Sequence, residues 1–287
     1  MKQDEVLRIL EGSYDLHVHP IPSHVPRCLD DFELVEQAAS YQMAGVMIKN
    51  HYESTAARAA LVNRRMSHLC TRAYGGVVLN WPAGGLNPYA AESALKLGAS
   101  FVWMPTRDSA HCLKSGDMPG DFFTRPGISV IDEEGKLLPV VYDIFDVIKK
   151  YDAVLATGHL SPAESMMLCK AGRKAGIHMV LTHPEWERTQ IDAASQKEMA
   201  DLGVWIEKNW YNIAERNCSA EQMAANIKVV GAHRIFLATD RGQAGKETPV
   251  EGYIRFIKVL HDQGISTEDL ITMAQKVPAE LLNRSIP

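Results

Sequence analysis

The 287-residue sequence has few cysteines and no spacing among them that suggests a disulfide framework. No pair forms a C-x-x-C motif, and the count of five is odd. We therefore expect buried free thiols in a reducing compartment. The cysteines are Cys28, Cys70, Cys112, Cys169 and Cys218.

Long apolar runs and blocks of basic residues are also missing. No stretch reaches the ~18 consecutive apolar residues of a membrane span, and Asp4 and Glu5 lie where a secretory signal would need apolar residues. The net charge of -5 and the absence of a block of Lys and Arg residues argue against binding to nucleic acids or anionic membranes. We expect a cytoplasmic protein that acts on a small molecule and binds neither nucleic acid nor membrane; homo-oligomerisation stays open.

What the sequence does have is an alternation of strand-like and helix-like segments. The strand-like segments begin near residues 14, 46, 76, 99, 153, 177, 203 and 234. Eight such β/α units predict the α/β class and a (β/α)8 TIM barrel, in a single domain over residues 1–287. A doubly wound open sheet is the alternative, but no Gly-x-Gly-x-x-Gly follows the first strand.

One long connection interrupts the alternation, between Thr106 and Asp152. Its first part is rich in Gly and Pro, and residues 128–131 and 136–139 then flank Glu134-Gly135 in a hairpin-like pattern. A helix is expected from about 143 to 151. We predict a β-hairpin-containing insertion after strand 4 that covers an active site, with a disordered segment as the alternative.

Two further helices are expected from composition and capping. The segment from Ser54 to about Arg72 is rich in Ala, Leu and Arg, which predicts a long helix. Ser161-Pro162-Ala163-Glu164 combines an N-cap, a proline in the first turn and a capping-box glutamate. The free N–H groups at this second helix start could hold an anionic group of a substrate.

Histidines and one aspartate collect where the predicted strands end. In a TIM barrel these ends meet at one rim and carry the chemistry. Residues i and i+2 of a strand face the same side, so His17 and His19 converge. We interpret four residues as ligands of a divalent metal, with a network of hydrogen-bonded histidines as the alternative. They are His17, His19, His159 and Asp240.

Other residues at the same rim have less decisive roles. His183 is expected to be a metal ligand or to lie beside one. Lys49 and His51 are further ligand candidates. The alternative for Lys49 is an ion pair with Asp240, and the alternative for His51 is to orient its loop. Glu207 and His24 are expected to be solvated or salt-bridged. Candidates for substrate binding, with salt bridges or rim packing as the alternative, are Arg107, His111 and Trp186.

This pattern resembles the amidohydrolase superfamily of metal-dependent TIM-barrel hydrolases, over about residues 14 to 242, within an uncharacterised branch. The resemblance rests on His17-x-His19, His159, His183 and Asp240. It implies a divalent metal, usually zinc, and hydrolysis of an amide, ester or related bond. One or two ions are open, because residues 101–104 offer no Lys or Glu to bridge two metals. A carboxylated Lys49 would supply such a bridge.

A second resemblance covers part of the chain. His17-x-His19, His24 and Asn50-His51 are similar to the opening of the polymerase-and-histidinol-phosphatase family, whose members hydrolyse phosphoesters. Asp240-Arg241-Gly242 lacks the Asp-x-His that would complete that match. A phosphoesterase is therefore the alternative function.

Together these features predict a metal-dependent hydrolase of the amidohydrolase type acting on an amide, a lactone, another ester or a related bond. Asp240 is the expected general base and proton donor to the leaving group, and His183 would polarise the substrate carbonyl or complete the metal shell. A lyase or hydratase could use the same metal to stabilise an enolate, and an inactive barrel could keep the metal for stability alone.

Overall fold

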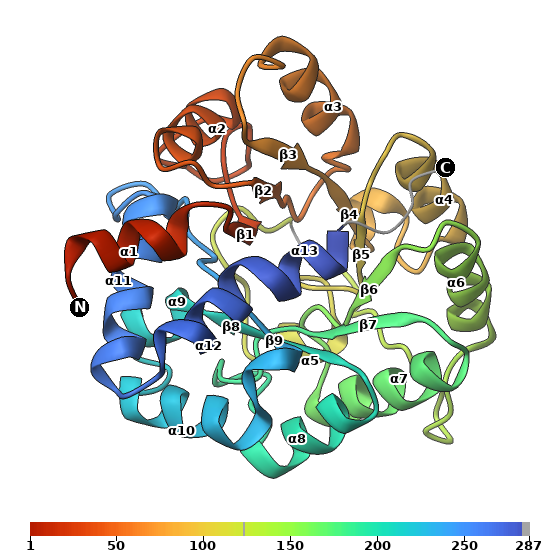
Figure 1. Cartoon of the computed structure of the whole chain (residues 1–287). Coiled ribbons are helices and arrows are strands. Elements are labelled where there is room, and N and C mark those ends of the chain that lie inside the picture. Colours follow the sequence, from red (N-terminus) through yellow and green to blue (C-terminus); the bar gives the residue numbers. More distant parts are fainter. Residues whose placement is uncertain (123, 283–287) are drawn as a thin grey trace.

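Parallel strands surrounded by helices form this α/β protein, whose computed structural model describes residues 1–122 and 124–282 (Figure 1). The predicted domain also includes residues 123 and 283–287, which lie outside the described residues. The strands are β1 (Tyr14–Val18), β2 (Gly45–Ile48), β3 (Arg72–Tyr74), β4 (Gly76–Val78), β5 (Phe101–Trp103), β6 (Val154–Ala156), β7 (His178–Leu181), β8 (Trp205–Asn209) and β9 (Ile235–Ala238).

Helices follow most of the strands. They are α1 (Gln3–Leu10), α2 (Asp31–Ser40), α3 (Ala56–Arg65), α4 (Pro88–Lys96), α5 (Ala110–Leu113), α6 (Pro139–Lys150), α7 (Pro162–Lys174), α8 (Ala193–Asp201), α9 (Trp210–Ala214), α10 (Ala220–Val230), α11 (Pro249–Asp262), α12 (Thr267–Ile271) and α13 (Val277–Leu282), with short turns η1 (Trp81–Ala83), η2 (Ala232–Arg234) and the π-helical η3 (Thr272–Lys276). None of these described helices has the length and apolar character needed to cross a bilayer. Ser161 caps α7 as expected, because its hydroxyl accepts from the Glu164 N–H while the Glu164 carboxylate accepts from the Ser161 N–H.

The strands pair in chain order and always in parallel. One sheet has the order β1-β2-β3 and the other runs from β4 to β9, with only Gly75 between β3 and β4. At the far side, Asp240 N–H donates to the His17 carbonyl and His19 N–H to the Arg241 carbonyl, both at 2.8 Å. The chain therefore returns to β1 just after β9, which brings the two histidines beside Asp240.

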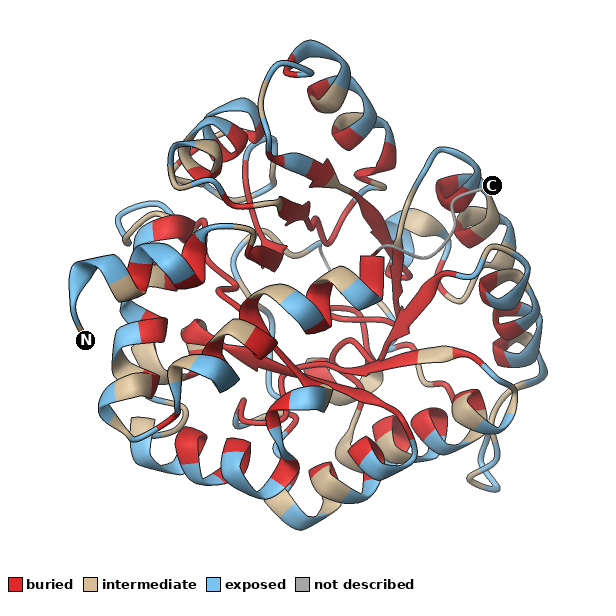
Figure 2. Cartoon of the chain, in the orientation of Figure 1, coloured by how far each residue is buried: buried red, intermediate tan, exposed pale blue. Residues whose placement is uncertain are grey.

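Apolar side chains pack on both faces of the strands, so nearly all strand residues are buried; the clearest exception is β3, where Arg72 is exposed (Figure 2). A hydrophobic core of large residues on the inner face of the strands includes Leu16, Phe101, Trp103 and Phe236. Leu281 of α13 joins this core near the points where the strands begin. Fully burying each such side chain is worth about 1.5–3 kcal/mol. Since α13 packs at the beginnings of the strands, the polar residues at their other ends face a separate opening.

The long connection differs from its prediction at its helix. A single antiparallel bridge joins Ile131 to Leu137, and the Leu138 N–H donates to the Val130 carbonyl at 2.9 Å. The helix start near residue 143 is wrong: α6 begins at Pro139. Proline fits the first turn of a helix because its fixed φ suits the helix and its missing N–H would have no partner there.

The helix expected from Ser54 to about Arg72 is also too long. It ends at Arg65, and Arg72–Tyr74 forms β3 against β2. The Arg72 N–H donates to the Ala44 carbonyl at 2.9 Å. Strand pairing at the edge of β2 therefore overrides the helical propensity of the last residues of this segment.

Candidate metal centre

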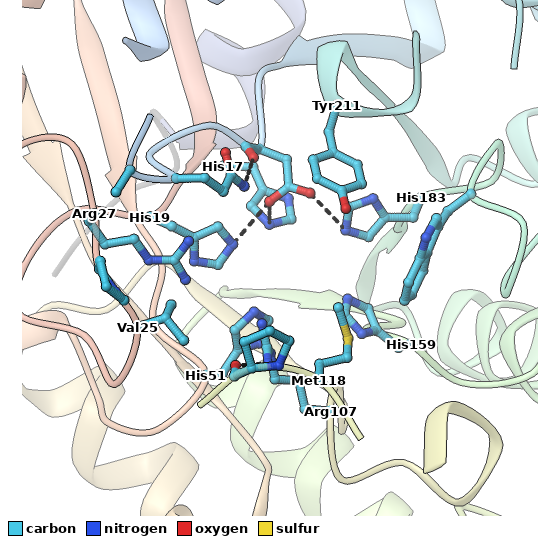
Figure 3. A pocket seen from close by; sticks show the side chains of 16 residues that line it. His17, His19, Val25, Arg27, His51, Arg107, Met118, His159, His183 and Tyr211 are labelled. Carbon is cyan, nitrogen blue, oxygen red and sulfur yellow. Dashed lines mark hydrogen bonds and ion pairs between the residues drawn. The ribbon is translucent and has the colours of Figure 1, made fainter. Parts of the chain in front are cut away.

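His17 and His19 converge on the carboxylate of Asp240 (Figure 3). The His19 Nε2 lies 3.0 Å and the His17 Nε2 3.2 Å from the same oxygen, Asp240 Oδ1. A second group joins His17 with His183 and Glu207, and in each group the ligand atoms all lie within 4.8 Å of one another. The strands β1 and β8 and the residues that follow β1, β7 and β9 thus meet at one polar centre.

Unusual backbone conformations direct the side chains at this centre. His183 and Asp240 both have φ of 53°, in the left-handed region that non-glycine residues rarely adopt. Gly242 follows closely with φ of 131°, and a Cβ there would lie 2.0 Å from the His19 carbonyl oxygen. Such strain concentrates at functional sites, where the surrounding structure maintains it.

Asp15 ties the end of β9 to β1 and was not singled out by the sequence. Its carboxylate accepts from the Thr239 N–H at 3.0 Å and from the Thr239 hydroxyl. Burial raises the pKa of Asp15 to about 7, against the lowering effect of the Thr239 hydrogen bonds. Asp15 therefore positions the two strand ends from which His17 and Asp240 extend.

Glu207 is buried and bonded to His17 instead of being solvated. Its Oε1 lies 2.8 Å from His17 Nδ1. A proton on Nδ1 that is donated to Glu207 makes Nε2 the acceptor nitrogen, which is the usual arrangement around a metal-bound histidine; in this structure Lys49 Nζ lies against that nitrogen. The signal in the sequence was an acid directly after the apolar residues 204–206 of the predicted strand.

Lys49 reaches the same imidazole from β2. Its Nζ lies 2.9 Å from His17 Nε2. Burial lowers the pKa of Lys49 to about 8, while Asp240 and Glu207 act in the opposite direction. The lysine is thus beside the centre, as expected for a residue that pairs with it or serves as a ligand.

His51, His159 and His183, the other histidines of the predicted site, lie around this centre. His183 Nε2 lies 3.8 Å from Asp240 Oδ2, and the His159 ring centroid is 5.3 Å from that of His183. His51 stacks on His19 at 4.8 Å, and its Nδ1 bonds the Thr106 hydroxyl at 2.8 Å. His159 and His51 line the pocket, but neither belongs to the two groups of converging ligand atoms.

Burial keeps the imidazoles neutral. It lowers the pKa of His17 to about 3, with Lys49 adding to the effect, and that of His183 to about 4. Burial would raise the pKa of Asp240, but its interaction with His17 and the hydrogen bond from His19 hold it well below its usual range. Neutral imidazole and ionised carboxylate are the forms that bind cations. Burial also lowers the pKa values of His19, His51 and His159.

A pocket of about 440 Å³ opens over the centre. Of the three predicted substrate contacts, Arg107 and Trp186 line it, and the Trp186 ring centroid lies 4.8 Å from that of His159. His111 does not line it: its Nε2 bonds the carbonyl oxygen of Arg188. Three lining residues that the sequence analysis left unassigned are Arg27, Met118 and Tyr211.

The donor set fits a divalent cation. Three imidazoles and a carboxylate suit zinc and neighbouring transition metals. Both ring nitrogens of His159 and the Nδ1 of His183 are buried and have no hydrogen-bond partner among the described residues. Buried nitrogens without partners are costly, and a cation or an ordered water would satisfy them.

A family model described as "Family of unknown function (DUF6282)" matches residues 12–207. A search of curated proteins found no match.

Solved structures with the same fold include an amidohydrolase from Pseudomonas aeruginosa, at 11% identity and a TM-score of 0.68, with 96% of this chain and 97% of that chain covered. A lactonase from Listeria monocytogenes has 12% identity, a TM-score of 0.62 and coverages of 96% and 95%. A mutant of an organophosphorus hydrolase from Deinococcus radiodurans has 12% identity, a TM-score of 0.57 and coverages of 96% and 94%. The resemblance to the amidohydrolase superfamily is therefore confirmed at the level of the fold.

Proposed function

Since the chain belongs to the DUF6282 family, whose function is unknown, we propose from its site that it is a metal-dependent hydrolase of a small molecule. The bond cleaved is an amide, a lactone, another ester or a related bond. One observation carries the proposal: two neutral imidazoles meet the ionised Asp240 at a pocket of about 440 Å³. The metal ligands, the proton acceptor Asp240 and the space for a substrate are then found at the same place in the molecule.

The architecture that we propose for this activity is a (β/α)8 barrel. β3 and β4 count as one strand position because only Gly75 separates them, and the hydrogen bonds from Asp240 and His19 link the two ends of the strand series. In such a barrel the ends of the strands carry the active site. The place of the histidine cluster supports this reading.

The metal ligands in this proposal are His17, His19, His183 and Asp240, with His159 next to them. When bound, a divalent cation, with zinc the first candidate, polarises the scissile bond and acidifies a water molecule. Glu207 holds the tautomer of His17 that leaves Nε2 available. We favour one ion for two reasons. β5, the fourth strand of the proposed barrel, carries only the apolar residues Phe101–Trp103 and so offers no group to bridge two ions, and the Lys49 ammonium lies beside His17.

Proton transfer is assigned to Asp240. Its carboxylate is ionised, faces the pocket and can take the proton of the attacking water, then return it to the leaving group. His183 is placed to polarise the substrate oxygen, and Trp186 forms a wall of the pocket. His51 orients the loop after β2 through Thr106.

The phosphoesterase alternative has weaker support. His24, one of the residues on which it rests, stacks on the ring of Tyr52 at 3.8 Å and is not among the residues that line the pocket. A lyase or hydratase on the same centre would differ in its product. A lyase product contains no added water, and a hydratase product contains a water molecule added across a double bond.

Elemental analysis tests the metal, and a substrate panel tests the reaction. Protein purified with zinc or manganese supplementation should hold close to one equivalent, and a panel of lactones, amides and phosphoesters should yield a hydrolysis product. A metal content below about a tenth of an equivalent per chain after supplementation would contradict the proposal.

A further inference from the structure

Two guanidinium groups border the pocket, and they are held very differently (Figure 3). Arg27 extends from the loop before α2 and is half-buried. Its only side-chain hydrogen bond among the described residues joins Nε to the Ser23 hydroxyl at 3.3 Å, and no described carboxylate pairs with it. Both terminal nitrogens of Arg27 are therefore uncommitted.

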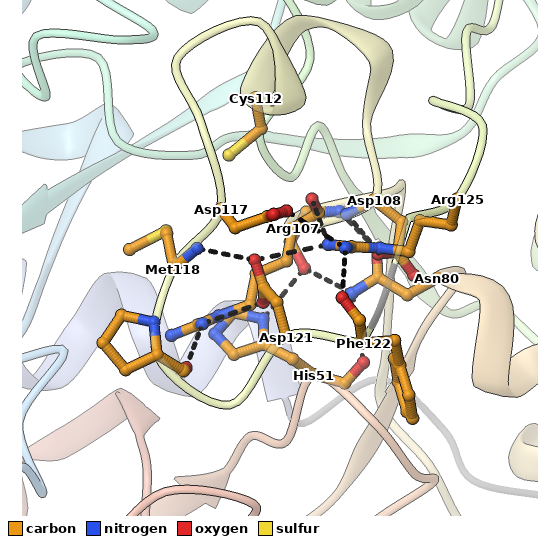
Figure 4. Close-up of polar contacts among 12 residues, drawn as sticks. His51, Asn80, Arg107, Asp108, Cys112, Asp117, Met118, Asp121, Phe122 and Arg125 are labelled. Carbon is orange, nitrogen blue, oxygen red and sulfur yellow. Dashed lines mark hydrogen bonds and ion pairs between the residues drawn. The ribbon is translucent and has the colours of Figure 1, made fainter.

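Arg107 is tied to the segment that covers the pocket (Figure 4). Its Nη1 donates to the Pro119 carbonyl at 2.7 Å and to Asp121 at 3.0 Å. Asp121 also pairs with Arg125, and Arg125 pairs with Asp108. Arg107 thus holds residues 117–121 in place, and its charge is neutralised by Asp121.

Among the described residues, no carboxylate forms an ion pair with Arg27, and Asp240 is the acid whose charge acts on it most. Asp121 compensates Arg107, and Asp240 is engaged by His17 and His19. Burial lowers the pKa of Arg27, which reflects a cation held in a partly buried place; the charge of Asp240 opposes this, that of Arg107 adds to it, and Tyr52 and Cys28 oppose it less. A guanidinium remains protonated in proteins, so this positive charge calls for an anion.

We propose that Arg27 binds a carboxylate of the substrate. The proposal rests on the hydrolase function above, since it places this carboxylate in the same pocket as the bond to be cleaved. Two uncommitted Nη groups form the planar fork that matches the two oxygens of a carboxylate. Val25, Met118 and Trp186 line the same pocket and supply apolar surface for the body of the molecule. The substrate class is thus an apolar or aromatic carboxylic acid that carries a hydrolysable bond.

Binding of small probes to metal-free and zinc-loaded protein tests this directly. Benzoate, benzamide and phenyl phosphate share a ring and differ in the group offered to Arg27. Calorimetric or NMR titration should show benzoate binding at least about 10-fold more tightly than benzamide, because only the anion gains charge-assisted hydrogen bonds. Equal binding of the two would overturn the proposal. Tighter binding of phenyl phosphate than of benzoate would overturn the carboxylate assignment in favour of a phosphate.

The matched variants are Arg27→Met, Arg27→Lys and, on the exposed face of α3, Arg65→Met. Arg27→Met keeps the apolar stem and should weaken benzoate binding about 10- to 100-fold. Arg27→Lys keeps the charge without the fork and should lie between, and Arg65→Met should bind as wild type. Unchanged binding in Arg27→Met, with circular dichroism like wild type, contradicts the role of Arg27.

The two proposals fail separately. Arg27-dependent benzoate binding without hydrolysis of any carboxylated lactone, ester or amide would leave the anion site standing and remove the hydrolase. Zinc-dependent hydrolysis of carboxylated and neutral substrates with equal kcat/KM, unchanged in Arg27→Met, would keep the hydrolase and remove the anion site.

Discussion

Glu207 and Lys208 are neighbours on β8, and they belong to two different buried polar clusters. Glu207 points to His17 in the cluster beneath the pocket. Lys208 points to the opposite side of the strand, where its ammonium contacts Glu185 and the Gln196 side-chain oxygen. Asn226 completes this outer cluster, with its amide 3.0 Å from Glu185. We call these the inner and the outer cluster.

The two clusters are equally buried but differ in access. His17, His183 and Asp240 line the pocket, whereas Lys208, Glu185, Gln196 and Asn226 do not. Among the described residues, both clusters keep buried polar atoms without partners: nitrogens of His159 and His183 in the inner cluster and Glu185 Oε2 in the outer one, where Lys208 is nevertheless paired with Glu185. Access to the pocket is thus what separates the clusters, and a buried charge indicates a reactive site only where it borders space for a ligand.

The largest effect should come from His17→Ala in the inner cluster. The variant loses the ligand nitrogen that faces both Asp240 and Lys49, and it leaves Glu207 without its imidazole. Metal content should fall below about a tenth of an equivalent and turnover by about 10³-fold or more. Elemental analysis and the hydrolysis assay measure both, with the exposed His68→Ala as the control. Full metal content in His17→Ala would remove His17 from the ligand set.

Lys208→Met should instead affect stability. It leaves Glu185 as a buried anion without its cation, which typically costs about 3–5 kcal/mol in the free energy of unfolding. Denaturant unfolding measures this cost, and the double variant Lys208→Met/Glu185→Gln should recover much of it. Metal content under native conditions should stay at the wild-type level. Loss of metal without loss of stability would show that the outer cluster belongs to the centre.

Asp240→Asn separates chemistry from folding within the inner cluster. The amide keeps the size of the side chain and removes the proton acceptor, so turnover should fall by about 10²-fold, or roughly 2.7 kcal/mol of barrier. Metal should largely remain, because His17, His19 and His183 are intact. Near wild-type turnover in this variant would favour the lyase or purely structural readings of the metal.

The smallest effect is the pH dependence of the metal-free protein. The pKa of His183 is about 4 in the folded chain against 6.5 for an ordinary histidine, so the unfolded chain binds more protons in this interval. The free energy of unfolding should therefore be highest above pH 6.5 and fall as the pH drops toward 4. Each such histidine adds about 1.4 kcal/mol per pH unit to the slope.

His183→Asn checks the assignment of that slope. Urea titrations at several pH values should show a shallower dependence in the variant than in wild type. The outer cluster contains no imidazole, so the double variant Lys208→Met/Glu185→Gln, which removes both ionisable groups of that cluster, should shift the whole curve and keep its slope in this range. An unchanged slope in His183→Asn would mean that other groups dominate the acid loss of stability.

Several residues of the inner cluster were accessible to sequence reasoning because they lie at strand ends. His17 and His19 share a face by the two-residue repeat of a strand, and the α/β alternation predicts that Asp240 ends at the same rim. Glu207 was visible as an acid directly after the apolar residues 204–206, yet its partner was not, since 190 residues separate it from His17. Arg27 lies in an irregular loop whose path no periodicity describes.

By itself, the sequence determined the succession of strands and helices, the capping of α7 by Ser161 and the placement of the histidines at strand ends, because each follows from local periodicity or local hydrogen bonding. Only the tertiary structure decided that Arg72–Tyr74 pairs with β2 as a strand, that Glu207 faces His17 while Lys208 faces Glu185, and that Arg27 borders the pocket. These outcomes depend on contacts between distant segments, and the free energy of such contacts outweighs local propensity.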